Sequence, residues 1–74
     1  MRFRARDVLD LLESSGVDVV RFGSRVRLEK GAVIRVFELE ETLTSRFVAG
    51  LARLFGVPEE QLFALPRVAP KHEP

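Results

Sequence analysis

The sequence contains no cysteine, tryptophan, tyrosine or asparagine, and its only methionine is Met1. Without cysteine, neither a disulfide framework nor a thiolate metal site is available to stabilise the fold. No apolar run approaches the roughly 20 residues that cross a bilayer, and no segment has the pattern of a signal peptide. We therefore expect a cytoplasmic protein without a membrane partner.

Sequence motifs for catalysis are also missing. There is no glycine-rich phosphate loop and no cysteine–histidine cluster. The single histidine, His72, lies in a segment rich in proline, where nothing would hold it in the geometry that general-base catalysis needs. The sequence thus predicts no catalytic residue, no metal ligand and no cofactor.

The basic charge comes almost entirely from arginine. Of the 12 basic residues, only Lys30 and Lys71 are lysines, and the remaining ten are arginines. Arginine suits bidentate contacts with phosphate or carboxylate groups. A GC-rich genome would supply the same bias without functional pressure, and the scarcity of thermolabile residues beside many charges would suit a thermophile.

The segment 17–37 predicts an antiparallel meander of three strands. Its β-branched runs, 17–22, 25–29 and 32–37, are separated by turns at Gly23-Ser24 and Lys30-Gly31. In the middle run, arginine and glutamate alternate strictly with valine and leucine, which is typical of a strand with one wet face and one buried face.

Amphipathic helices flank this meander and have the apolar faces needed to cover it. The first is expected over 5–15, with Gly16 just past its end, and the second from a cap at Thr42 or Thr44 to Gly56. A short third helix should begin at Pro58 and end before Pro66. The pattern predicts an α+β fold: helix, three-stranded antiparallel meander, helix and short C-terminal helix.

One domain over 1–65 and a flexible tail over 66–74 account for the 74 residues. Because so short a chain buries only about 60% of its unfolded surface, self-association as a homodimer would support its stability. At the other end, Arg2, Arg4 and Arg6 alternate with apolar residues ahead of the first helix, where the helix dipole disfavours cations. They predict either a solvated basic end or a phosphate-binding arm.

Candidate binding residues lie in the meander. If the arginines of all three strands point outward, one exposed sheet face carries four guanidinium groups. The cations could pair with Glu29 and Glu38 across the strands, or they could bind a phosphate backbone. On the second interpretation, the predicted nucleic-acid-binding residues are Arg21, Ser24, Arg25, Arg27 and Arg35.

Two motifs resemble the HicA-type toxins of bacterial toxin–antitoxin pairs. The helix 7–16 contains a Leu-Leu-Glu stretch before a glycine, and 20–25 contains an arginine followed by Gly-Ser. The resemblance implies a fold like that of double-stranded-RNA-binding domains, in which two helices cover one face of a sheet. It also implies messenger RNA as substrate and an antitoxin protein as partner.

The family's catalytic histidine follows the Gly-Ser pair, and here that position is Arg25. Arginine stays protonated at neutral pH and so cannot act as a general base, but it can bind phosphate. The resemblance therefore favours a domain that binds RNA without cleaving it. The alternatives are a protein–protein interaction module, as a homodimer or with an antitoxin-type partner, and an active ribonuclease that uses another base.

Overall fold

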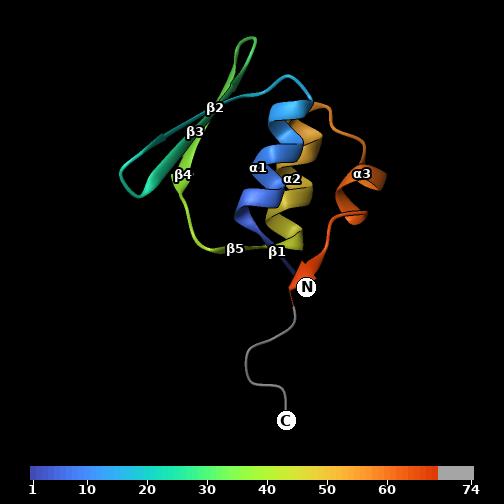
Figure 1. Cartoon of the computed structure of the whole chain (residues 1–74). Coiled ribbons are helices and arrows are strands. Elements are labelled where there is room, and N and C mark those ends of the chain that lie inside the picture. Colours follow the sequence, from blue (N-terminus) through green and yellow to red (C-terminus); the bar gives the residue numbers. More distant parts are fainter. Residues whose placement is uncertain (69–74) are drawn as a thin grey trace.

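The computed structural model describes residues 1–68, which form an α+β fold with three helices and two three-stranded antiparallel sheets (Figure 1). This is the fold class that the sequence predicts. The elements in chain order are β1 (Arg2–Arg4), α1 (Ala5–Ser14), β2 (Asp18–Phe22), β3 (Arg25–Lys30), β4 (Val33–Glu38), β5 (Thr42–Thr44), α2 (Ser45–Phe55), α3 (Glu59–Phe63) and β6 (Arg67–Val68).

The predicted meander is the sheet β2-β3-β4, with β3 at its centre. Gly23 and Gly31 have φ angles of 61° and 60°, which only glycine adopts without strain, and each begins a tight turn. The second turn contains Gly31 and Ala32, so β4 starts one residue later than expected. Figure 1 shows α1 and α2 side by side between this sheet and α3.

The helices bury most of the faces that their periodicity predicts, while Phe47 and Leu54 of α2 stay partly exposed. Both Val26 and Leu28 of β3 are fully buried, and they join one core with the buried residues of α1 and α2. Thr44, rather than Thr42, caps α2: its Oγ1 accepts a hydrogen bond of 3.2 Å from the amide of Phe47. Pro58 lies at the N-cap of α3, one residue before its first helical position.

The sequence did not predict the second sheet, which has the order β5-β1-β6. Arg2 pairs with Thr44 and with Val68, which joins segments far apart in the chain. Arg67 and Val68, which were expected in the flexible tail, instead form β6, whereas residues 69–74, including His72, lie outside the described residues. Strands of two or three residues are too short to produce a periodic pattern.

Replacing Leu28 by alanine should destabilise the fold by about 2–5 kcal/mol, because it opens a cavity in the closed core beneath the sheet. Ile34→Ala, on the opposite face and 46% exposed, should change the free energy of unfolding by no more than about 0.5 kcal/mol. Urea denaturation of both variants measures the difference. Equal effects would mean that the helices do not cover the side of the sheet that carries Leu28.

Candidate interaction site

The strand register determines which side chains share a face of the meander. Residues paired across antiparallel strands point to the same side, and successive residues alternate. Phe22 and Glu38 pair with Arg25, Val20 and Val36 with Arg27, and Asp18 and Ile34 with Glu29. We call the side away from the helices the open sheet face, and it consists of Asp18, Val20, Phe22, Arg25, Arg27, Glu29, Ile34, Val36 and Glu38.

The expectation of four guanidinium groups on one exposed face is wrong. Arg21 pairs with Val26 and Arg35 pairs with Leu28, so both lie on the side that faces the helices. The two-residue turn at Gly23-Ser24 sets Phe22 opposite Arg25, which turns the neighbouring Arg21 to the other side. The length of this turn is visible in the sequence and could have revealed that Arg21 and Arg25 lie on opposite sides of the sheet.

Three of the predicted site residues, Ser24, Arg25 and Arg27, contact carboxylates, as the ion-pairing alternative predicts. Arg25 Nε donates a hydrogen bond of 2.8 Å to Oε2 of Glu38, and Ser24 Oγ donates one of 2.9 Å to Oε1 of the same carboxylate. The hydrogen bonds from Arg25 and Ser24 hold the pKa of the Glu38 carboxyl below its ordinary value. Arg27 Nη2 lies 3.9 Å from Oε1 of Glu29, so a phosphate would compete with a carboxylate for each arginine of this face.

Large apolar side chains are exposed on the same face. Val20, Phe22, Ile34 and Val36 keep 44%, 46%, 46% and 49% of their surface accessible. They occupy the two outer strands, and the arginines lie between them on β3. The face thus carries two pairs of exposed apolar side chains, one on each side of the charged row of β3, and large exposed apolar groups gathered on one face of a small domain are typical of a contact with another molecule.

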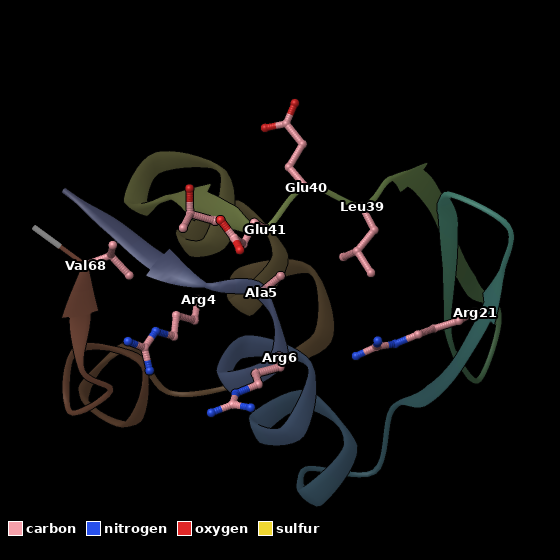
Figure 2. A pocket seen from close by; sticks show the side chains of 9 residues that line it. Arg4, Ala5, Arg6, Arg21, Leu39, Glu40, Glu41 and Val68 are labelled. Atoms are coloured by element: carbon pink, nitrogen blue, oxygen red, sulfur yellow. The ribbon is translucent and has the colours of Figure 1, made fainter. Parts of the chain in front are cut away.

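A separate pocket of about 620 Å³ is lined by arginines from three elements: Arg4 at the end of β1, Arg6 in α1 and Arg21 in β2. Two carboxylates, those of Glu40 and Glu41, line it as well. In Figure 2, Arg21 extends toward the side of the pocket where Arg4 and Arg6 lie, while Glu40 points the other way. Among residues 1–68, no carboxylate lies within 4 Å of these three guanidinium groups.

The sequence indicated part of this pocket through the alternating arginines ahead of α1. Arg2, which belongs to the same series, is already bonded: its Nε donates to Oγ1 of Thr42 at 2.7 Å, and its Nη2 lies 3.7 Å from Glu40. The participation of Arg21 depends on the position of the sheet beside α1, which local patterns do not reveal.

Within the described part of the chain, no three side chains of the metal-binding types are grouped so as to hold an ion. None of the helices there has both the length and the apolar character to span a membrane. No family model, curated protein or solved structure matches this chain. The resemblance to HicA-type toxins therefore stays a prediction that depends on two short motifs.

Replacing Arg25 by glutamine should raise the pKa of the Glu38 carboxyl toward its ordinary value of 4.5, because the ionised form loses a hydrogen bond and a neighbouring cation. In the wild type the folded-state pKa is lowered, so this interaction stabilises the fold above about pH 4.5 and is lost as the pH falls through the folded-state pKa. NMR titration of the side-chain carboxyl measures the shift. Arg27→Gln, which leaves both hydrogen bonds of Glu38 in place, serves as the control, and an unchanged Glu38 pKa in Arg25→Gln would contradict the assignment.

Proposed function

We propose that this chain is a protein-interaction module that associates with a second copy of itself through the open sheet face. The observation that carries the proposal is the exposure of Val20, Phe22, Ile34 and Val36 on that face. Covering these side chains would remove apolar surface from water at a gain of about 25 cal/mol per Å². Two sheets pack face to face at a separation of about 10 Å, which allows such side chains to interdigitate.

The charges of the open sheet face are complementary to themselves. The face carries two arginines and three carboxylates, so a second protein surface suits it better than a polyanion does. Arg25 and Glu29 lie two residues to either side of Arg27 on β3. If two β3 strands cross antiparallel at Arg27, Arg25 of each copy meets Glu29 of the other, and the same pair forms twice about the two-fold axis. Arg27 of one copy then meets Arg27 of the other on the axis, where each guanidinium has the carboxylate of its own Glu29 at 3.9 Å.

The size of the face sets the expected affinity. At the usual strand spacing and rise, three strands of five residues measure about 14 Å by about 17 Å. This footprint is well below the roughly 800 Å² per partner of a standard stable interface. We therefore expect weak, reversible self-association in the micromolar to millimolar range.

Exchange of charges across the proposed interface provides a specific test. Arg25→Glu and Glu29→Arg should each abolish self-association, because each places like charges together twice. An equimolar mixture of the two variants should associate, since both contacts then join opposite charges. Sedimentation equilibrium at up to about 1 mM protein measures all three samples, a range that follows from the expected weak affinity.

Two results would overturn the self-association. One is a wild-type protein that stays monomeric over the whole concentration range, and the other is a mixture that associates no better than its components. Arg53→Glu, at an exposed position of α2 that is not part of the open sheet face, should leave the wild-type behaviour unchanged. A third result is also informative: a monomeric wild type could capture an antitoxin-type protein, and Ile34→Ser could abolish that capture. The open sheet face would then still be an interface, but its partner would be the antitoxin-type protein instead of a second copy.

A second candidate function is RNA binding without cleavage, as the resemblance to HicA-type toxins predicts. One observation favours it: Arg4, Arg6 and Arg21 line a common pocket, and among residues 1–68 none of them forms an ion pair within 4 Å, although Glu40 and Glu41 also line the pocket. These three arginines are better suited to bind phosphate groups than Arg25 and Arg27 are, because Arg25 and Arg27 already contact carboxylates.

The cytoplasmic location also stays a prediction of the sequence.

The triple variant Arg4→Ala, Arg6→Ala and Arg21→Ala should lose RNA affinity at low salt. If each arginine neutralises one phosphate of a single strand, the slope of log affinity against log salt should decrease by about 2. Fluorescence anisotropy at several salt concentrations measures both effects, with Arg25→Ala plus Arg27→Ala as the matched control.

The outcomes of this experiment separate the candidate surfaces. Loss of binding only in the Arg25→Ala plus Arg27→Ala variant would return the RNA site to the open sheet face. Absence of wild-type binding at low salt would exclude RNA binding as a function of this chain. Intact RNA after incubation is the expected result, and turnover by pure protein would support an active ribonuclease instead.

A further inference from the structure

A third surface lies between β4 and α2 and serves neither candidate function. It is a groove of about 450 Å³ lined mainly from the helix side of β4, and Val36 is its one lining residue that also belongs to the open sheet face. No acidic residue lines it. Its lining includes Arg35, Phe37, Arg46, Phe47, Gly50 and Leu54.

The floor of the groove is apolar. The rings of Phe37 and Phe47 form an edge-to-face pair with centroids 4.9 Å apart and planes inclined by 78°. Phe47 remains 40% exposed, and Leu54, nearly two turns further along α2, is half-buried. The apolar stripe predicted for α2 thus extends beyond the core, and Phe47 contributes to this groove instead of to the buried interior.

Gly50 lies in the middle of α2, where glycine costs about 1 kcal/mol relative to alanine. Its φ angle is not positive, and a Cβ atom added there would meet nothing within 4 Å. Neither the backbone conformation nor the packing of residues 1–68 therefore requires glycine at this position. In the groove, however, the missing side chain allows another chain to approach the helix closely.

The cations beside this floor determine the charge of a suitable occupant. Arg35 Nη1 donates a hydrogen bond of 2.8 Å to the carbonyl oxygen of Ile34. Within the described residues, no carboxylate lies within 4 Å of Arg35 or Arg46. Since β4 is an edge strand, its outer side can also pair with an extended chain.

We infer that this groove binds an extended acidic segment of a partner protein. Two apolar side chains of the segment, two residues apart, fill the space over Gly50 beside Phe37 and Phe47, and carboxylates at either end pair with Arg35 and Arg46. The inference goes beyond self-association and does not depend on it, because Arg35 and Phe37 lie on the opposite side of β4 from Ile34 and Val36.

Labelled seven-residue peptides test the inference directly. The first probe, Glu-Ser-Leu-Ser-Phe-Ser-Glu with both termini blocked, presents two carboxylates and two apolar side chains on one side of an extended chain. The second replaces both glutamates by lysine, and the third replaces leucine and phenylalanine by serine. The full chain should bind the first probe at least about tenfold more tightly than either of the others, a difference of about 1.4 kcal/mol, as fluorescence anisotropy will measure.

The variant Gly50→Leu distinguishes an effect on probe binding from an effect on the stability of the fold. Leucine favours the helix and has room in the groove, so this variant should unfold at a higher temperature than the wild type and yet bind the first probe at least tenfold more weakly. Arg35→Ala plus Arg46→Ala should weaken binding and reduce its salt dependence. Arg53→Ala, on the same helix and 3.6 Å from Glu59, is the matched control and should bind as the wild type does.

The inference would be overturned if the wild type failed to bind the first probe at millimolar concentration, or if the lysine probe bound equally well. Binding unchanged in a folded Gly50→Leu variant would also exclude the groove. If Gly50→Leu does not fold, the double variant Arg35→Ala plus Arg46→Ala provides the test instead. Unchanged affinity of that variant for the first probe would exclude the groove as the binding site.

Discussion

The burial of Val26 and Leu28 at the centre of β3 is the constraint on which the rest of this structure depends. Both side chains are fully buried, and they determine which side of the meander α1 and α2 cover. A slip of one residue would expose them and turn Arg25 and Arg27 into the apolar interior. The cost of burying two charges excludes that arrangement, and the turns at Gly23 and Gly31 then carry the same register to β2 and β4.

This register distributes the arginines of the meander over surfaces of different character. Arg25 and Arg27 stay on the open sheet face, where carboxylates of the same face accompany them and apolar side chains flank them. Arg21 reaches the pocket of Arg4 and Arg6, and Arg35 lies beside the groove along α2. The small domain therefore has an apolar face of mixed charge, an arginine-rich pocket that two glutamates also line, and a basic groove, in place of one extended basic sheet.

The predictions succeeded where a local pattern has a local physical cause. Alternation in β3, glycine at the two turns and the apolar stripes of α1 and α2 each depend on a few neighbouring residues, and the structure contains all of these elements. The assignment of Arg21 and Arg35 to the exposed face was wrong, although the two-residue turn at Gly23-Ser24 held the information needed to correct it. The sheet β5-β1-β6 joins Arg2 with Thr44 and Val68, and no local pattern indicates such pairing.

Sequence alone determined the fold class, the central strand and the faces of both long helices, because hydrophobic periodicity follows from backbone geometry within each element. Only the tertiary structure decided which arginines lie together, how far Phe47 is exposed, and that Gly50 faces a groove and not the core. These properties depend on the placement of whole elements against one another, and that placement arises from many weak contacts between residues distant in the chain.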